Sequence, residues 1–168
     1  MKILETERLV LRELDKECDA AFTRELLNSP KFLKYIGDRE VRTTEEAADF
    51  IENRYAASYR EHGYGLWAVD LKKNGIPVGI CGFVRRDTLP GPDLGFAFLP
   101  EFERQGYGME SASAVLNYGR EKLQFTDVWA ITSLDNDASG RLLEKLGFKL
   151  QESDQHADES LKLYLSKP

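Results

Sequence analysis

Residues 96–112 read FAFLPEFERQGYGMESA, and this stretch decides how the middle of the chain folds. It begins as a short apolar strand, bends at Pro100, continues into a loop that contains Gly106 and Gly108, and ends as a helix. Such a junction leaves backbone N–H groups without partners at the positive end of the helix dipole. The glycines let a ligand approach the backbone, because they carry no Cβ. The stretch therefore predicts a site for a phosphate or pyrophosphate group.

Two common nucleotide-binding motifs are excluded by what this loop lacks. A dinucleotide-binding fingerprint needs a third glycine at position 111, where the chain has Ser111. A P-loop needs a Gly-Lys-Ser/Thr run, which is absent here. Taken alone, the loop fits a purely structural turn between a strand and a helix equally well.

The composition is that of an ordinary globular protein. The 168 residues fit a single domain, residues 1–168, with 42% hydrophobic and 31% charged residues. A formal net charge of −6 argues against a surface that neutralises nucleic-acid phosphates. The acidity suits a cationic substrate, such as an amine or a basic polypeptide, or serves solubility alone.

Cysteine and histidine usage predicts neither a disulfide nor a metal site. Cys18 and Cys81 lie far apart in no ligand-like spacing, and His62 and His156 are isolated. Residues 1–8 hold no apolar signal region, and no run approaches the roughly 20 apolar residues needed to cross a bilayer. We expect a cytoplasmic protein without a metal, a membrane association or a nucleic-acid partner.

Hydrophobic periodicity predicts four helices around the loop. The first is capped by Asp15 and ended by Pro30, and its apolar positions are Cys18, Ala21, Phe22 and Leu26. The second opens with a capping box of Thr43 and Glu46 and closes at Gly63. The others run from about residue 108 to 123 and from residues 135–136 to Gly147. Residues 31–42 lack a clear period and are expected to be a loop, with room for a short helical turn, that shapes a binding site.

The strands are expected at residues 9–14, 66–71, 76–84, 93–99, 128–132, 148–150 and 161–165. The run at 128–132 is apolar and β-branched, which is typical of a strand buried on both faces. The sum is an α+β sheet protein with a β-α-β crossover near its middle.

A second motif, residues 133–148, reads SLDNDASGRLLEKLGF and follows the next strand. With it, the chain resembles the GNAT superfamily of acyl-CoA-dependent N-acyltransferases, most closely the RimJ/RimL-like branch. The matching pieces are Glu7 to Arg12, Gly79 to Gly82, the Gly106-Tyr107-Gly108 loop with Glu110, and the run from Asn136 to Phe148. They cover nearly the whole chain in the right order, and the last run is the most specific.

The resemblance implies a mixed, mostly antiparallel, twisted sheet of about six or seven strands with helices on both faces. It also implies that the sheet splays open around the pantetheine of acetyl-CoA, and that the loop amides hold the pyrophosphate. Asn136 is expected near the pantetheine as well as at a helix N-cap, and Ser139 is expected to point toward the thioester sulfur. The implied cofactor-binding residues are Phe98, Leu99, Arg104, Gln105, Gly106, Tyr107, Gly108, Met109 and Asn136.

The loop departs from the family pattern at two positions. Glu103 stands where the family commonly has Gln, Arg or an aromatic residue, and Arg104 stands where glycine is frequent. Glu103 cannot donate a hydrogen bond to a phosphate. Arg104 either supplies a compensating charge or is simply solvated.

The family resemblance implies direct attack of an amine on the thioester in a ternary complex. Asp93 is the candidate base, with an ordinary turn-exit carboxylate as the alternative reading. The backbone N–H of Phe98 or Leu99 is the candidate oxyanion donor, and Ser139, then Tyr164, the candidate acid. Tyr35, Trp67 and Phe83 are the candidate walls of the acceptor pocket, although aromatics at strand spacing are more often core residues.

The predicted activity is thus acetyl transfer to a primary amine, in a protein N-terminus or a small molecule, by a monomer or homodimer. Two other readings stay open at this level. One is a non-catalytic acyl-CoA sensor or scaffold on the same fold. The other is an unrelated α+β interaction module whose glycine loop is only structural.

Overall fold

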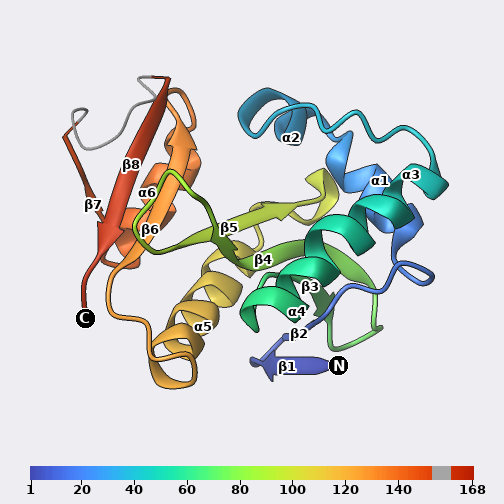
Figure 1. The fold of residues 1–168 in the computed structure, drawn as a ribbon, viewed down its shortest axis with the longest axis horizontal. Coiled ribbons are helices and arrows are strands. Elements are labelled where there is room, and N and C mark those ends of the chain that lie inside the picture. Colours follow the sequence, from blue (N-terminus) through green and yellow to red (C-terminus); the bar gives the residue numbers. More distant parts are fainter. Residues whose placement is uncertain (153–159) are drawn as a thin grey trace.

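The computed structural model describes residues 1–152 and 160–168, which form one eight-stranded sheet in the order β1-β2-β3-β4-β5-β6-β8-β7 (Figure 1). All pairings are antiparallel except that of β5 with β6. The strands are β1 (Lys2–Glu5), β2 (Leu9–Arg12), β3 (Leu66–Leu71), β4 (Pro77–Arg85), β5 (Pro92–Phe98), β6 (Val128–Ser133), β7 (Lys149–Leu150) and β8 (Leu161–Ser166).

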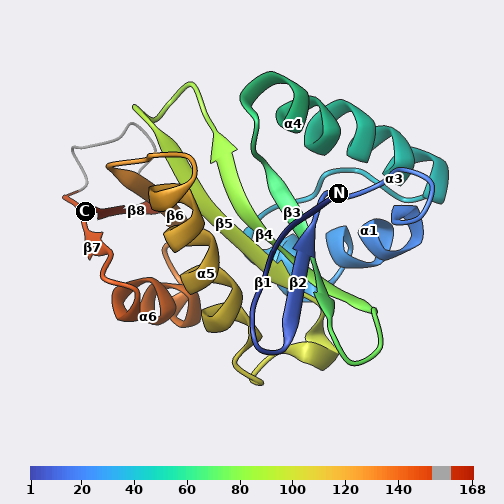
Figure 2. The same cartoon turned by 90° about the horizontal axis from the view of Figure 1, so that it is seen from below.

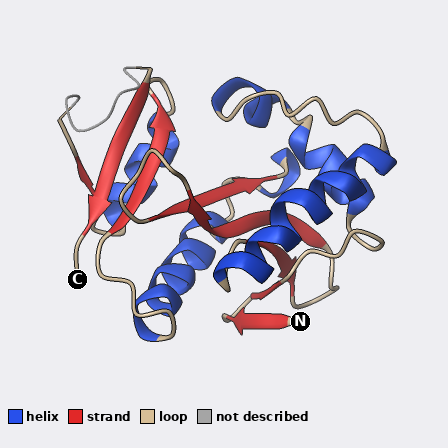
Figure 3. Cartoon of the chain, viewed as in Figure 1, coloured by secondary structure: helices blue, strands red, loops and turns tan. Residues whose placement is uncertain are grey.

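Helices cover both faces of the sheet, as expected (Figures 2 and 3). They are α1 (Ala20–Leu27), α2 (Pro30–Tyr35), α3 (Thr44–Phe50), the π-helical η1 (Ile51–Ala56), α4 (Ala57–His62), the 3₁₀ turn η2 (Pro100–Phe102), α5 (Tyr107–Glu121) and α6 (Asp137–Lys145). Alternation along the central strands divides the core. Trp67, Val69 and Cys81 pack with α5, whereas Ala68 and Ile80 pack with α1 and α3.

The mixed α+β architecture and the crossover from β5 through α5 to β6 are confirmed. The sheet has one strand more than the upper expectation, because β1 was missed. Lys2 and Glu5 are exposed and only Ile3 and Leu4 are half-buried, so this edge strand carries no buried alternating pattern. The strand β6 alternates between buried and half-buried residues and is not buried on both faces, as 128–132 was expected to be.

The first helices also differ from expectation. Pro30 occupies the first turn of α2 and does not merely end α1. The short helix α2 fills the start of the 31–42 segment, for which a loop with room for a short helical turn was expected. Asp15 does not cap α1, which begins at Ala20; its carboxylate accepts the N–H groups of Glu17 and Cys18 in the preceding turn. Consequently Cys18 and Ala21 are exposed, whereas Leu26 is buried as expected. The Thr43 capping box is present.

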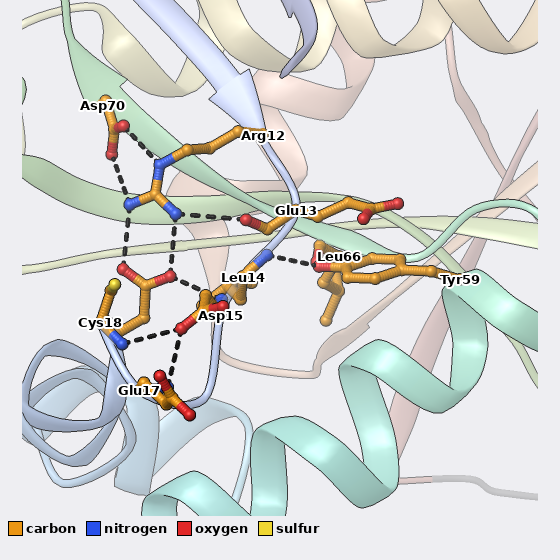
Figure 4. A network of polar contacts seen from close by, with 10 residues as sticks. Arg12, Glu13, Leu14, Asp15, Glu17, Cys18, Tyr59, Leu66 and Asp70 are labelled. Carbon is orange, nitrogen blue, oxygen red and sulfur yellow. Dashed lines mark hydrogen bonds and ion pairs between the residues drawn. The ribbon is translucent and has the colours of Figure 1, made fainter. Parts of the chain in front are cut away.

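A polar network around Arg12 fixes the end of β2 to β3 and to the start of α1 (Figure 4). Its guanidinium donates to Asp70 at 2.6 Å and to both carboxylate oxygens of Asp19 at 2.8 and 2.9 Å. Asp19 is 2% exposed and also accepts the N–H of Asp15. Buried carboxylates of this kind need a paired cation, so the network ties the start of α1 to β2 and β3.

Candidate functional site

The sheet opens between β5 and β6, because the only register pair that joins them is Asp93 with Trp129. Beyond Asp93 the two strands diverge (Figure 1). The N–H of Leu99 donates to Val78 O at 2.9 Å, toward β4. Successive N–H groups of a strand point to opposite sides, so the N–H of Phe98 faces the opening and that of Leu99 does not. Of the two backbone N–H groups expected as oxyanion donors, that of Phe98 stays a candidate and that of Leu99 does not.

The loop after β5 presents a row of amides at the start of α5. No backbone N–H of residues 104–109 donates a hydrogen bond of ordinary geometry within the described part of the chain. Those of residues 107–109 precede the first intrahelical donor of α5. Positive φ angles of 61° at Arg104 and 85° at Gly106 turn the backbone here. Amides turned in this way form a concavity suited to an anion.

A brace from the turn between β1 and β2 holds this loop. Arg8 donates to Gln105 O at 2.9 Å and to Glu110 at 2.7 Å, and its guanidinium lies over the Tyr107 ring at 4.5 Å. Thr6 also donates to Glu110, at 2.5 Å. Burial acts to raise the pKa of Glu110, but the hydrogen bonds from Thr6 and Arg8 outweigh it and hold that pKa below its ordinary value. Glu110 is therefore an ionised anchor for Arg8.

Two cavities meet at the opening of the sheet. The loop cavity, of about 610 Å³, is bounded by residues of the 98–108 segment, by α2 and by the start of α6. The hairpin cavity, of about 620 Å³, reaches from there to the β4–β5 connection and to η1 and α4. Their common walls are Phe32, Tyr35, Ile36, Phe96, Ala97, Asn136 and Ser139. Two ligands bound in these cavities would meet at this junction.

Asn136 and Ser139 lie at that junction, in the first turn of α6. Asn136 is the N-cap, and its Oδ1 accepts the N–H of Ser139 at 3.3 Å. Within residues 1–152 and 160–168, the side-chain NH₂ of Asn136 donates no hydrogen bond, so the two roles expected of this residue are compatible. Ser139 is half-buried and faces both cavities.

Tyr164 lies apart from the junction. It is 2% exposed and lines neither cavity. Its hydroxyl packs against α6, at 2.6 Å from where a Cβ on Gly140 would stand. Burial raises the pKa of Tyr164, which does not favour proton donation near neutral pH. The position of Tyr164 suits packing, not the acid role.

Asp93 lines the hairpin cavity and is 1% exposed. Arg86 Nε donates to both carboxylate oxygens, at 3.1 and 3.2 Å. Burial raises the pKa of Asp93 to about 6, because the desolvation of the carboxylate outweighs the attraction of the more exposed Arg86. A carboxylate with such a pKa is ionised at pH 7 and is basic enough to accept a proton.

The unusual Glu103 is paired with a cation. Lys31 Nζ lies 2.5 Å from Glu103 Oε2, and this ion pair ties α2 to the loop. The carboxylate of Glu103 thus faces the loop cavity with its charge balanced. Arg104 lines the same cavity, in the left-handed conformation that glycine adopts without strain.

The other expected site residues divide between cavity and core. Phe98, Gly108 and Tyr35 line the loop cavity. Gln105, Gly106, Tyr107, Met109 and Leu99 do not line it. Trp67 is 1% exposed, stacks edge-on with Phe83 and Tyr118, and lines neither cavity. Phe83 is a fully buried member of the same cluster that reaches the wall of the hairpin cavity.

Sequence reasoning missed the residues that join distant segments. The Arg8–Glu110 brace spans 102 positions and the Lys31–Glu103 pair spans 72, so no local pattern reveals them. Phe96, at the junction, was quoted as part of a strand but not as a site residue. A Ser-Pro step at residues 29–30 is the signal that could have placed a helix in the cavity wall.

The fold and site together define an α+β protein whose sheet opens between β5 and β6, with two cavities that meet at the opening. The model of the acetyltransferase (GNAT) domain matches residues 8–149. A relative from Bacillus subtilis, described as the uncharacterized N-acetyltransferase YoaA, is 31% identical over 149 residues, 88% of this chain and 82% of YoaA. The chain belongs to the GNAT acetyltransferase family.

Solved structures agree with this fold. The acetyltransferase from Agrobacterium tumefaciens superposes with a TM-score of 0.84 at 24% identity, over 100% of this chain and 95% of its own. RimL, the ribosomal L7/L12 α-N-protein acetyltransferase in complex with coenzyme A, gives 0.81 at 16% identity, over 99% and 98%. Both likenesses are likenesses of fold. In the described ranges, 1–152 and 160–168, no helix is long and apolar enough to cross a membrane.

Proposed function

We propose that this protein transfers the acetyl group of acetyl-CoA to a primary amine by direct attack in a ternary complex. The observation that carries the proposal is the junction of the two cavities, where Asn136, Ser139 and Phe96 form walls of both. Acetyl-CoA would supply the thioester from one side and the amine would approach from the other. Holding both reactants at one place is itself a large part of such catalysis.

The residues present fit acetyl-CoA. The amides of residues 104–109 match a pyrophosphate, and the charge of Arg104 adds to the dipole of α5. The side-chain NH₂ of Asn136 is placed to bind an acceptor group of the pantetheine. The Phe98 N–H donates toward the oxygen on which negative charge develops.

Two side chains manage the protons in this proposal. Asp93, at the far wall of the hairpin cavity, accepts the proton of the attacking amine directly or through water. Ser139 donates to the departing thiolate. Because a hydroxyl is a weak acid, the proximity of Ser139 to the junction has to supply most of its effect.

The free cysteines, one exposed and one buried, support the expected cytoplasmic setting. That the protein is a monomer or a homodimer stays a prediction.

The test is release of the coenzyme A thiol from acetyl-CoA with a panel of amines, combined with the mass of the acetylated product. A matched pair of glycine variants examines the loop. Gly106→Ala and Gly75→Ala both place a Cβ at positive φ, 85° and 71°, but Gly75 lies in the β3–β4 turn, away from both cavities. We expect only Gly106→Ala to raise the KM for acetyl-CoA. Binding of acetyl-CoA without thiol release for any amine contradicts the proposed activity.

A further inference from the structure

Arginines line the hairpin cavity, although the chain as a whole carries a net charge of −6. Arg39 follows α2, Arg54 lies in η1, Arg85 ends β4 and Arg86 follows it. Three separate parts of the fold therefore bring guanidinium groups to one cavity. Arginine presents a planar fork of donors that matches a carboxylate or a phosphate.

The carboxylates on the same walls do not balance these charges. Asp93 is taken by Arg86, and Glu61 has His62 as its nearest ionic partner, at 3.9 Å. Within residues 1–152 and 160–168, Arg39 and Arg54 form no ion pair. The wall carries four arginines against two carboxylates, which leaves the cavity positive.

Arg39 and Arg54 are held in place by aromatic rings. The guanidinium of Arg39 lies 5.9 Å from the Phe32 ring centroid, and that of Arg54 lies 5.5 Å from the Phe50 centroid. Both act on the buried Tyr55 between them: burial raises the pKa of Tyr55, and the two arginines oppose that rise. Cation–π contacts of this kind position a guanidinium without neutralising it.

We propose, on the basis of the acetyltransferase function proposed above, that the acceptor is an amine bearing a carboxylate or phosphate group, which Arg39 and Arg54 bind. The amine then extends toward Asp93 and the junction, while the anionic group stays at the outer wall. A polyamine or a lysine-rich peptide would bring further positive charge into a positive cavity. The arginines also favour the neutral form of the amine, which is the form that attacks the thioester.

The experiment compares kcat/KM for acceptors of similar size that differ in charge. The peptides Ser-Asp-Asp-Ala, Ser-Asn-Asn-Ala and Ser-Lys-Lys-Ala, all as C-terminal amides, represent a protein N-terminus. The amines 4-aminobutyrate, 4-aminobutanamide and putrescine represent small molecules. We expect the acidic acceptor of at least one series to exceed its neutral analogue by about tenfold, because a charge-assisted hydrogen bond is of that strength. The advantage should shrink with added salt, since the Debye length is only about 10 Å at 0.1 M. The series with the larger effect identifies the source of the anion.

Variants assign the effect to residues. Arg39→Gln and Arg54→Gln should each lower the acidic-to-neutral ratio of kcat/KM about fivefold, through a higher KM for the acidic acceptor. Arg24→Gln is the matched control, since Arg24 is an exposed arginine of α1 that lines neither cavity. A preference for the lysine peptide or putrescine, or an unchanged ratio in both variants, overturns the proposal while the acetyltransferase activity stands.

A binding measurement keeps the proposal testable if no amine is acetylated. N-acetylglutamate is titrated into the protein in the presence of coenzyme A by calorimetry. Weaker binding to Arg54→Gln than to Arg24→Gln supports an anion site at the outer wall. Equal affinities, or no binding to the parent protein, overturn it.

Discussion

Replacing Asp93 by asparagine should change how the stability of this protein depends on pH. The folded state raises the pKa of Asp93 from 3.8 to about 6 through burial. Between these values the folded state binds more protons than the unfolded state, so the stability of the parent protein falls as pH rises. At 1.36 kcal/mol per pH unit, the cost of ionising Asp93 in the fold reaches about 3 kcal/mol above pH 6. Asparagine resembles the protonated carboxyl group and avoids this cost.

The assay is urea unfolding of both proteins between pH 3.5 and 7.5. We expect the free energy of unfolding of Asp93→Asn to gain on that of the parent by up to about 3 kcal/mol over this range, mostly between pH 4 and 6. Asp87→Asn, which alters an exposed carboxylate in the same β4–β5 connection, is the control and should follow the parent curve. Parallel curves for Asp93→Asn and the parent would refute the argument that burial dominates this site.

Activity offers a second readout of the same group. The α-amino group of an acceptor has a pKa of about 7.7–8.0 and is protonated below it. A plot of log kcat/KM against pH therefore already falls toward acid with a slope of about 1, whatever the base is. If Asp93 is the base, the slope should steepen to about 2 below pH 6 in the parent and stay near 1 in Asp93→Asn. An unchanged profile and rate would remove Asp93 from the base role but not from the stability argument.

Three further predictions concern the loop and α6. Arg104→Gly should raise the free energy of unfolding by about 0.5–1 kcal/mol, because φ is 61° at this position, whereas Arg104→Ala should not raise it. Chemical denaturation of both variants measures this difference. An equal loss of acetyl-CoA affinity in the two variants would assign that loss to the missing charge. Arg8→Met should raise the KM for acetyl-CoA about fivefold and leave kcat unchanged, because the loop loses its hydrogen bonds to Arg8. Steady-state kinetics measure both constants. A fall in kcat alone would contradict a role of Arg8 in holding the loop. Gly140→Ala should reduce the free energy of unfolding by about 1–2 kcal/mol and so lower the melting temperature, since the new Cβ would stand 2.6 Å from the hydroxyl oxygen of Tyr164. Adding Tyr164→Phe should recover part of this loss. Calorimetry that shows no recovery would refute the clash.

Elements with strong local signals were predictable from the sequence. The Thr43 capping box and the left-handed Gly63 at the end of α4 depend on residues next to one another, and both are as expected. The formation of strand β1 and helix α2 depends on neighbouring parts of the fold and not on a strong local sequence pattern. The half-buried β1 gains its backbone partners only from β2, and α2 is a single short helix that begins at a proline.

The parts of the candidate site that consist of backbone N–H groups were predictable from the sequence. The parts that depend on contacts between side chains from distant segments were less predictable. The loop amides follow from the glycines and the start of α5. Which of Phe98 and Leu99 faces the opening depends on the register with β4, which no single strand encodes. Trp67 was a candidate wall of the acceptor pocket, with packing in the core as the alternative, and in the structure it is buried against Tyr118 in the core.

The net charge of the chain is a poor guide to its acceptor, because a cavity responds to the charges nearest to it. Much of the acidity lies in pairs elsewhere, such as the two carboxylates that hold Arg12. Charges more than about 10 Å away across solvent are largely screened at 0.1 M salt, whereas Arg39 and Arg54 stand on the cavity wall itself. The overall charge of −6 suits a cationic substrate or serves solubility alone, whereas the arrangement of the arginines favours an acceptor that carries an anionic group. A charge-matched acceptor series therefore separates the effect of composition from that of position, which the sequence alone does not.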